Sequence, residues 1–393
     1  MLNFEQACQA LAPGSTVLLR VDLNLSRDSQ GEWILNERFH RVIPVVKQLL
    51  AMRFAVVLVS HLGRPRAGVW EEKFSLASLC IQLEKLLARP VTFLSAWPYQ
   101  ETYLAAGTVA LAENTRFLKG EKENDVSLAK KMVENIDLVV MEAFSCSHRS
   151  HASTVGILSS AQSVLGPGHL SELRGVEKFL RSSSPRTAFI GGKKISTKLP
   201  LLMKLLQTVD TICFGGGIAN TLLHAKGFSL GTSWVEYSCL AEVDRFCQLA
   251  KERNVELVLP HDVLVSDDLT TFQKKRSVDI DSVLPHECIV DVGPGSMKLF
   301  EQFVMRSKSV YWNGPLGIYE FRSGLIATAR LASLLSDCQA YTLVGGGDTL
   351  SALAMLGGGE FSHLSTGGGA FLHYLANGST PVLNLMRELE LAV

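Results

Sequence analysis

The strongest constraint on the fold is the alternation of short apolar runs with segments of helical periodicity along the 393 residues. Ser15–Leu19 reads STVLL and Ala55–Val59 reads AVVLV, whereas Val126–Ile136 and Leu199–Val209 carry apolar residues at helical spacing. Further strands are predicted at Asp137–Met141, Thr187–Ile190, Thr211–Phe214, Val255–Leu259, Ser309–Trp312 and Ala340–Val344. Apolar strands separated by helices are typical of parallel sheets that are covered on both faces.

This number of strands and the chain length predict an α/β fold with two doubly wound parallel-sheet (Rossmann-like) domains. The breaker cluster Leu165-Gly-Pro-Gly-His169 is followed by a helical stretch, His169 to Arg181, and by a second cluster at 182–186. We therefore predict a first domain over 1–168, a hinge with an interdomain helix over 169–183, and a second domain over 184–373. Ligands of such domains lie beyond the carboxyl ends of the strands.

The composition excludes several classes of function. Lys+Arg and Asp+Glu are both 38, so the formal net charge is +0, and no broad basic surface for nucleic acid is expected. No apolar run is long enough for a membrane span, and the N-terminus MLNFEQACQALAPG has no apolar core of a signal peptide. The eight scattered Cys without C-x-x-C argue against a disulfide framework or a zinc site and predict a cytoplasmic protein.

Glycine triplets occur at 215–217, 345–347, 357–359 and 367–369. All but the third follow a predicted strand or a short loop and precede a helical pattern. Backbone N–H groups without a Cβ beside them admit a phosphate, and a helix N-terminus favours an anion. These three triplets therefore predict a nucleotide or phosphate site, although such glycines also serve tight packing; 357–359 is predicted to be only a turn. The absence of G-x-x-x-x-G-K-[ST] and G-x-G-x-x-G disfavours a P-loop NTPase and a dinucleotide dehydrogenase.

Lysines follow the predicted strand at 187–190, in FIGGKKISTK. Lys194 and Lys198 are four residues apart, so on a helix they share one face and repel each other unless an anion lies between them. The alternative is a solvated helix face. In the loop from Trp312 to Glu320, Glu320 is a candidate acceptor for ribose hydroxyls. Asp348 taken alone is better explained as a helix N-cap than as a Mg²⁺ ligand.

Basic residues stand at the predicted strand exits of the N-terminal half, within RVDLN, SHLGRP, ENTR and HRSH. Arg64, Arg116 and Arg149 occupy comparable exits, and Arg38 precedes a helical run. Guanidinium groups match phosphate and carboxylate geometry. We therefore predict one anion-binding crown on the first domain, although each arginine taken alone is better explained by a surface ion pair.

Taken together, the motifs resemble those of the phosphoglycerate kinase family. The series RVDLN, SHLGRP, LAENTRF, HRSHASTVG, GGKKISTK, GGGIANT, WNGPLGIYEF, GGGDT and STGGGA runs in family order along nearly the whole chain. The resemblance implies reversible phosphoryl transfer from 1,3-bisphosphoglycerate to ADP, giving 3-phosphoglycerate and ATP, in cytoplasmic glycolysis. It also implies Mg²⁺, a monomer, and a C-terminal tail, 374–393, that packs back on the first domain.

The resemblance assigns roles by position. It implies a substrate site made of Asp22, Asn24, Arg38, His61, Arg64, Arg116 and Arg149. It implies a nucleotide site made of Gly192, Lys194, Lys198, Gly215, Gly216, Asn313, Glu320, Gly347, Asp348 and Thr349, with Asp348 as the metal ligand. Arg38, Lys194, Gly367 and Gly368 would assist the moving phosphoryl group.

The implied chemistry needs no general base, because the attacking carboxylate has a pKa of about 3.5 and is ionised at pH 7. The reaction instead requires that two anions are aligned and that the charge on the transferred group is screened. These requirements predict closure about the hinge and exclusion of water.

Several residues depart from the family pattern: Glu142, Ser145, Cys146, Lys193 and His373. Ser145 stands where a glycine is usual, and Lys193 where a small residue is usual. Cys146 lies close to His148 and Arg149, which raises the hypothesis of a lowered pKa and a reactive thiol, but an inert thiol is the favoured interpretation. Two other functions remain open, namely a non-catalytic nucleotide-binding member of the family and a different α/β enzyme with a sugar-phosphate ligand.

Overall fold

The computed structural model describes residues 3–28, 30–100, 103–268, 270–271 and 274–391. The chain divides into two compact units: unit 1 comprises Met1–Leu173 and Gly369–Val393, and unit 2 comprises Arg174–Gly368. The division falls inside helix α6 (Pro167–Arg181), between the limits of 168 and 184 expected from the sequence. That separately folding domains meet at residues 168 and 184, with a hinge between them, stays a prediction. Positions 1–2 of the first range and 392–393 of the tail lie outside the described residues.

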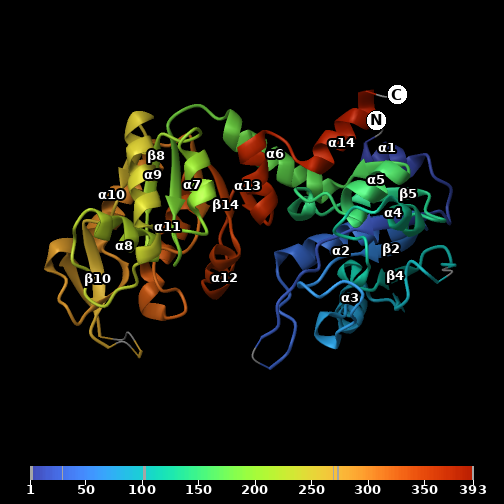
Figure 1. Ribbon diagram of the computed structural model, residues 1–393, viewed down its shortest axis with the longest axis horizontal. Helices are drawn as coiled ribbons and strands as arrows, with labels where there is room; N and C mark the ends of the chain where they lie inside the picture. Colours follow the sequence, from blue (N-terminus) through green and yellow to red (C-terminus); the bar gives the residue numbers. More distant parts are fainter. Residues whose placement is uncertain (1–2, 29, 101–102, 269, 272–273, 392–393) are drawn as a thin grey trace. The chain divides into compact units, whose positions relative to one another are not determined.

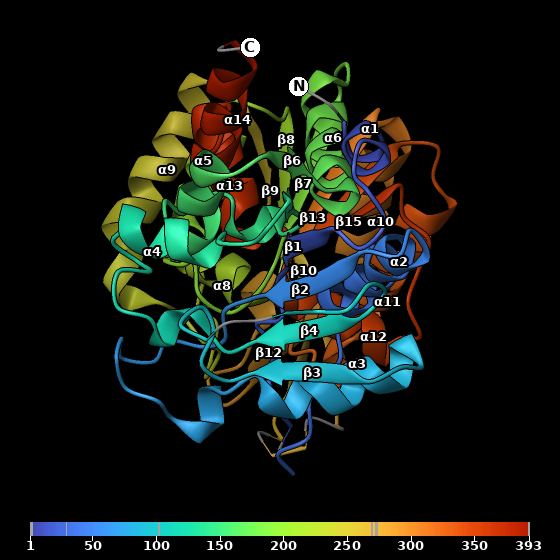
Figure 2. The same ribbon diagram turned by 90° about the vertical axis from the view of Figure 1, so that its right-hand side faces the viewer.

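Unit 1 is built on a six-stranded sheet in which every pair of neighbouring strands is parallel. Its spatial order is β3 (Val91–Leu94), β4 (Val109–Ala112), β2 (Ala55–Val59), β1 (Thr16–Arg20), β5 (Leu138–Met141) and β6 (Ser163–Leu165). Figure 2 shows β3, β4, β2 and β1 side by side. The chain runs outward from β1 in both directions, so the carboxyl ends of β1 and β5 border a topological switch point.

Helices cover both faces of this sheet, because its strands are apolar on both sides. Val17 and Leu19 pack into one core with α2 (Glu37–Ala51) and α3 (Cys80–Leu87), whereas Leu18 packs into the other. The second core includes α4 (Val126–Met132), α5 (Ile157–Ser160) and the C-terminal helix α14 (Pro381–Leu391). Helix α14 lies against α5 (Figure 1), so the C-terminal segment is part of unit 1, as is α1 (Phe4–Gln9).

Unit 2 contains a second six-stranded parallel sheet. Its order is β15 (His363–Ser365), β14 (Tyr341–Gly345), β13 (Ser309–Asn313), β7 (Arg186–Ile190), β8 (Thr211–Phe214) and β9 (Glu256–Val258). The direction of winding reverses between β7 and β13. The covering helices are α7 (Leu199–Leu205), α8 (Gly216–Ala225), α9 (Leu240–Glu252), α10 (Pro294–Arg306), α11 (Ile326–Asp337) and α12 (Gly347–Met355). Helix α13 (Gly368–Asn377) follows β15.

The predicted fold class is confirmed, and all eight predicted strands are present with ends shifted by at most two residues. Of the three predicted helical stretches, those at 126–136 and 199–209 end early, at Met132 and Leu205, and the one at 169–181 is confirmed within α6. The sequence did not predict β3, β4, β6 and β15, nor a three-stranded antiparallel sheet of β11 (Arg276–Asp279), β10 (Asp262–Ser266) and β12 (Cys288–Val292). Strand β11 is largely exposed and reads RSVD, so it carries no apolar signal.

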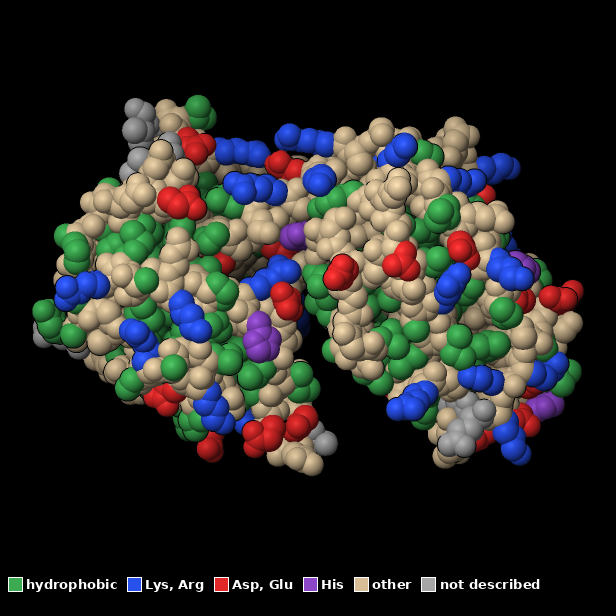
Figure 3. All heavy atoms as spheres, turned by 180° about the vertical axis from the view of Figure 1, so that it is seen from behind, with side chains coloured by type: hydrophobic (Ala, Val, Ile, Leu, Met, Phe, Trp, Pro, Cys, Tyr) green, Lys and Arg blue, Asp and Glu red, His purple; other side chains and the backbone are tan. Residues whose placement is uncertain are grey.

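Within the described residues, no helix has both the length and the apolar character needed to cross a bilayer. On the face drawn in Figure 3, basic and acidic side chains are interspersed. A concentration of charge of one sign is therefore a local feature of this protein. The candidate site described in the next subsection is an example.

Candidate active site

The carboxyl edge of the sheet in unit 1 gathers the predicted substrate residues. Asp22 and Asn24 follow β1, His61 follows β2, and Arg116 lies in a 3₁₀ turn after β4. Arg149 follows β5, and Arg38 lies in the first turn of α2, where the Asn36 side chain caps the backbone N–H of Arg38. The parallel sheet brings these loops together because all of its strands end at this edge.

Asp22 is the acidic centre of the cluster. Its Oδ2 accepts a hydrogen bond from Nη1 of Arg38 at 3.2 Å and another from the Ser145 hydroxyl, and its Oδ1 accepts from the Asn24 N–H at 3.1 Å. Burial raises the pKa of Asp22, but Arg38 and these hydrogen bonds outweigh burial, so the net pKa is lowered. Asp22 is therefore an ionised group that orients Arg38.

His61 is a neutral imidazole among guanidinium groups. Arg149 Nη1 lies 2.9 Å from His61 Nε2, and Arg20 Nη2 lies 3.4 Å from Nδ1. Burial lowers the pKa of His61 well below its usual range, and the charges of Arg20, Arg116 and Arg149 lower it further. Because a guanidinium only donates, Nε2 is the accepting nitrogen.

Arg116 and Arg64 flank Gly63 but differ in their surroundings. Arg116 is buried and donates through Nη1 to the Gly63 carbonyl, while its Nε has no partner. Burial, followed by the charge of Arg149, lowers the pKa of Arg116. Arg64 is exposed, and within the described part of the chain its guanidinium forms no hydrogen bond. The expected crown thus contains Arg116 and Arg149 close together, with Arg64 at its rim.

Arg20 is a member of the cluster that the sequence placed among the basic residues at strand exits but to which it gave no role. It is only 1% exposed, and it donates to the carbonyl of Ser153 at 3.1 Å and to the carbonyl of Val21. The Ser153 hydroxyl in turn donates to Glu121 at 2.6 Å. Its position at the end of β1 did not indicate which groups the Arg20 side chain would contact.

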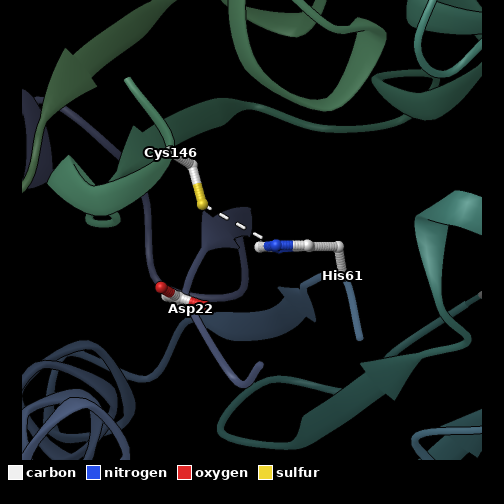
Figure 4. A group of neighbouring side chains, drawn as sticks. All are labelled: Asp22, His61 and Cys146. Carbon is white, nitrogen blue, oxygen red and sulfur yellow. Dashed lines mark hydrogen bonds between the residues drawn. The ribbon is translucent and has the colours of Figure 1, made fainter. Parts of the chain in front are cut away.

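Asp22, His61 and Cys146 form a group whose ligand atoms all lie within 4.8 Å of one another (Figure 4). Cys146 Sγ is 3.8 Å from His61 Nδ1. Such a set has the chemistry of a transition-metal site. Here, however, the same atoms already pair with Arg38 and Ser145, and Arg20 and Arg149 face the imidazole. These cations favour an anion at this place and oppose a divalent metal.

The suggested reactivity of Cys146 is wrong. The thiol is buried, and burial raises its pKa despite the opposing charge of Arg20. The neighbouring Ser145 has a clear role instead, because its hydroxyl donates to Asp22. No local sequence pattern predicts the contact between Ser145 and Asp22, because these residues are 123 positions apart.

Glu142, another departure, lies under the start of α6. Its Oε1 accepts from the Gly168 N–H at 2.8 Å, whereas its Oε2 is buried without a partner. Burial raises the pKa of Glu142 to about 8. A Cβ at Gly166 or Gly168 would lie 2.0–2.1 Å from a carboxylate oxygen of Glu142, so this loop requires glycine.

In unit 2, the three functional glycine triplets lie where β8, β14 and β15 end. Gly215 is the N-cap of α8, Gly346 is the N-cap of α12, and 367–369 enters α13. Asp348 therefore lies in the first turn of α12, and its interpretation as the N-cap is wrong. The remaining triplet, 357–359, lies in the turn after α12, as predicted.

A cavity of about 560 Å³ opens among these junctions. Its glycine wall is formed by Gly192, Gly216 and Gly217, and the Gly216 N–H donates to the Leu316 carbonyl at 2.7 Å. Gly216 has φ +62°, and a Cβ there would lie 2.9 Å from the Gly192 carbonyl oxygen. The volume and the apolar lining suit a nucleobase.

Lys198 and Lys194 do not share a helix face, contrary to the prediction. Helix α7 begins at Leu199, so Lys194 lies in the turn before it. Lys198 donates to Asn313 Oδ1, and burial lowers the pKa of Lys198 while the charge of Asp348 opposes that effect. Lys194 is exposed, and Lys193 lines the cavity with its Nζ 4.5 Å from the ring centroid of Trp234.

Asn313, the last residue of β13, lies between Ile190 of β7 and Gly345 of β14. Asp348 and Glu320 line the cavity. Thr349 is buried, where its hydroxyl donates to Gly345 and accepts from the Gly314 N–H. Its side chain thus fixes the loop after β13. Gly347 is exposed, and Gly367 donates its N–H to Ser365.

Comparison with known proteins gives one family. The family model described as phosphoglycerate kinase matches residues 9–378. Phosphoglycerate kinase of Coxiella burnetii is 38% identical over 375 residues, covering 95% of this chain and 95% of that protein. The enzyme of Desulfovibrio desulfuricans is 39% identical over 378 residues, covering 95% of this chain and 96% of the relative.

Solved structures agree with these sequences. The structure of phosphoglycerate kinase from Coxiella burnetii matches with a TM-score of 0.85 and 37% identity, covering 97% of this chain and 98% of that one. The structure from Pyrococcus horikoshii OT3 matches with a TM-score of 0.83 and 26% identity, covering 98% of both chains.

Proposed function

Because the chain belongs to the phosphoglycerate kinase family, we propose that its two sheet edges are the two half-sites of that reaction. The enzyme transfers a phosphoryl group reversibly between 1,3-bisphosphoglycerate and ADP, giving 3-phosphoglycerate and ATP in glycolysis. Unit 1 provides the phosphoglycerate half-site and unit 2 the nucleotide half-site.

The basic cluster of unit 1 supports the first assignment. Arg116 and Arg149 lie close enough for the charge of one to lower the pKa of the other, which an anion between them would relieve. Asp22 fixes Arg38, and neutral His61 accepts from Arg149, so the guanidinium groups are oriented before the substrate binds. The substrate residues are Asp22, Asn24, Arg38, His61, Arg64, Arg116 and Arg149.

The cavity of unit 2 supports the second assignment. Its glycine wall takes the base, Glu320 accepts from the ribose hydroxyls, and Lys194 and Lys198 bind the phosphates. The nucleotide residues are Gly192, Lys194, Lys198, Gly215, Gly216, Asn313, Glu320, Gly347, Asp348 and Thr349. Gly215, Gly347 and Thr349 act mainly through the backbone, because two lack a side chain and the third uses its hydroxyl internally.

Mg²⁺ fits this half-site, because the exposed Asp348 carboxylate lines the cavity and lies close enough to the half-buried Lys198 for its charge to act on that ammonium group. Carboxylates together with substrate phosphates are the ligands that Mg²⁺ takes. When bound, the ion neutralises charge on the phosphates of ADP and ATP. We assign Asp348 as its protein ligand.

The chain's residues bind, orient and screen charge. The carboxylate of 3-phosphoglycerate is ionised at neutral pH, so no proton has to be removed before attack. Arg38, Lys194 and the N–H group of Gly368 would stabilise charge on the transferring phosphoryl group, and Gly367, whose N–H donates to Ser365, would shape the loop beside it. Since the half-sites belong to different units, transfer requires a state in which the two ligands are in line.

We further propose that the enzyme acts in the cytoplasm as a monomer. All eight cysteines lie within the described residues, and all are free thiols, as is usual in reducing compartments. Light scattering at working concentration would give 42.9 kDa for a monomer, and a larger mass would contradict this assignment.

The observation that carries the site assignment is the ionised Asp22 holding Arg38 beside the buried His61–Arg149 pair. Coupled turnover with 3-phosphoglycerate, ATP and Mg²⁺ tests it. We expect Arg38→Ala and Lys194→Ala to fold normally and to lose at least about a hundredfold in kcat, the scale of one removed transition-state donor. Wild-type turnover in either variant would reject its role, and an exposed control, Lys122→Ala, should be unaffected.

A further inference from the structure

The segment from Lys193 to Lys198 carries three lysines but has no regular structure of its own. Two glycines precede it, and α7 begins only at Leu199. Like charges on a short irregular segment repel, and ordering such a backbone costs conformational entropy. Contacts from elsewhere in unit 2 must therefore hold it.

Glu236 provides the main contacts. Its Oε2 accepts from the Ser196 N–H at 3.0 Å, and its Oε1 accepts from the Ser196 hydroxyl at 2.6 Å. The Ile195 N–H donates to the same carboxylate. Burial raises the pKa of Glu236, but the hydrogen bonds from Ser196 and Ile195 and the charge of Lys194 reverse that effect, so the carboxylate is ionised at neutral pH.

Glu236 is itself held by α8. Its backbone N–H donates to the Thr221 hydroxyl at 3.1 Å, and that hydroxyl donates to the Gly217 carbonyl at 2.9 Å. Two residues earlier, Trp234 faces the Lys193 ammonium. A Cβ at Gly217 would lie 2.5 Å from the Lys193 carbonyl oxygen and 2.9 Å from Trp234 Cδ1, so these backbones are in close contact. Residues 234–236 thus connect the glycine wall to the lysine segment.

Glu236 does not neutralise Lys194 by direct pairing. Among the described residues, Lys194 takes part in no ion pair within 4.0 Å, although its charge acts on Glu236. The carboxylate binds the two residues that follow Lys194 and leaves the ammonium group to a ligand. Glu236 thus orders the backbone at 195–196 without forming a direct ion pair with the Lys194 ammonium group.

We propose that Glu236 is a positioning residue for phosphoryl transfer, which fixes the backbone at 195–196 and thereby holds Lys194 in its working position. The inference rests on the proposed binding of nucleotide phosphates by Lys194. Preorganised cations contribute most to the transition state, so loss of Glu236 should affect kcat and nucleotide binding and spare phosphoglycerate binding.

Steady-state kinetics of three variants test the inference. We expect Glu236→Ala to lower kcat about tenfold or more and to raise KM for ADP, with KM for 1,3-bisphosphoglycerate within about twofold of wild type. Glu236→Gln should be intermediate, because its amide can still accept from the Ser196 N–H. Glu242→Ala, an exposed glutamate in the first turn of α9, is the matched control and should behave as wild type. A Glu236→Ala enzyme with wild-type kcat would overturn the proposal.

A double-mutant cycle separates positioning from a general structural role. The dissociation constant of ADP is measured for Glu236→Ala, Lys194→Ala and the double variant. If Glu236 acts through Lys194, Glu236→Ala should have little further effect in the Lys194→Ala background. An undiminished effect there would reject the inference. Wild-type behaviour of Lys194→Ala would instead reject the proposed nucleotide site.

Ser196→Ala keeps the test decisive if Glu236→Ala does not fold. It removes one of the three donors and should lower kcat by about two- to fivefold at unchanged melting temperature. An unchanged kcat in this variant, together with an unchanged KM for ADP, would contradict the proposal.

Discussion

At the scale of single residues, the site depends on buried charges that are held by specific partners. Asp22 stays ionised because Arg38, Ser145 and Asn24 surround it, whereas Glu142 accepts only from the Gly168 and His169 N–H groups, and its Oε2 has no hydrogen-bond partner. Two acidic side chains at the edge of the same sheet thus have opposite protonation states at neutral pH. The difference follows from the adjacent Arg38 cation and the side-chain donor that only Asp22 has.

Glu142→Gln should change the pH dependence of stability. Unfolded Glu loses its proton near pH 4.5, but folded Glu142 retains it up to about pH 8. Between these values the unfolded state binds fewer protons, so stability falls as pH rises, by about 1.4 kcal/mol per pH unit. The variant lacks this loss and should exceed wild type by about 3 kcal/mol at pH 7, with a small difference at pH 4.5.

Urea unfolding at several pH values measures this effect. Glu123→Gln, at an exposed glutamate of unit 1, is the control and should follow wild type at every pH. Parallel stability curves for Glu142→Gln and wild type would show that Glu142 is ionised in the folded protein.

At the scale of elements, strand ends and helix starts create the nucleotide half-site. The switch between β7 and β13 lets two loops approach backbone to backbone, with Gly191 on one and Gly314 on the other. The Gly191 N–H donates to the Asn313 carbonyl at 3.0 Å, and the Gly192 N–H donates to the Pro315 carbonyl at 2.9 Å. Side chains at these glycines would separate the strands and close the cavity.

Gly314→Ala should be strongly destabilising. Gly314 has φ +98°, and its Cβ would lie 2.2 Å from the Gly191 carbonyl oxygen. Gly358 has the same φ of +98° but no atom within 4 Å of an added Cβ, so Gly358→Ala measures the backbone strain alone. We expect about 1 kcal/mol for Gly358→Ala and at least about 2 kcal/mol more for Gly314→Ala, with ADP binding weakened only in the latter.

Thermal melting and ADP titration of both variants provide the comparison. Equal losses of stability would mean that the collision with Gly191 is relieved by movement of the loop, and that the close approach is not required.

At the scale of the whole molecule, each unit has its own parallel sheet, and we propose one half-site at the edge of each sheet. The C-terminal segment from Gly369 onward belongs to unit 1, although the residues before it belong to unit 2. The chain therefore passes between the units twice, once within α6 and once at the start of α13. The glycine triplet at 367–369, which we propose to assist phosphoryl transfer, lies at the second passage.

Hydrogen exchange with one ligand at a time should separate the half-sites. We expect 3-phosphoglycerate alone to protect the loops that follow β1, β2, β4 and β5. ADP with Mg²⁺ should protect the segments 191–198, 215–217 and 313–320, because binding slows local opening only where the ligand makes contact. Protection by ADP of the loops in unit 1 would contradict the assignment.

The sequence by itself determined the fold class, eight of the strands and the expected chemical character of both sites. Apolar strands and helical periodicity are local patterns, and glycines or lysines at a strand exit act through the backbone beside them. Arg38 and Lys198 could be singled out because their charges stand next to predicted elements. The family motifs extended this to nearly every site residue.

Only the tertiary structure decided which side chains act together. Arg20, Ser145 and Glu236 acquire their roles from partners that are far away in the chain, at Ser153, Asp22 and Ser196. Burial, which no local pattern specifies, raises the pKa of the Cys146 thiol and raises the pKa of Glu142 to about 8. Ionisation and hydrogen bonding depend on what surrounds a group in space, so they become defined only when the sheets bring distant loops together.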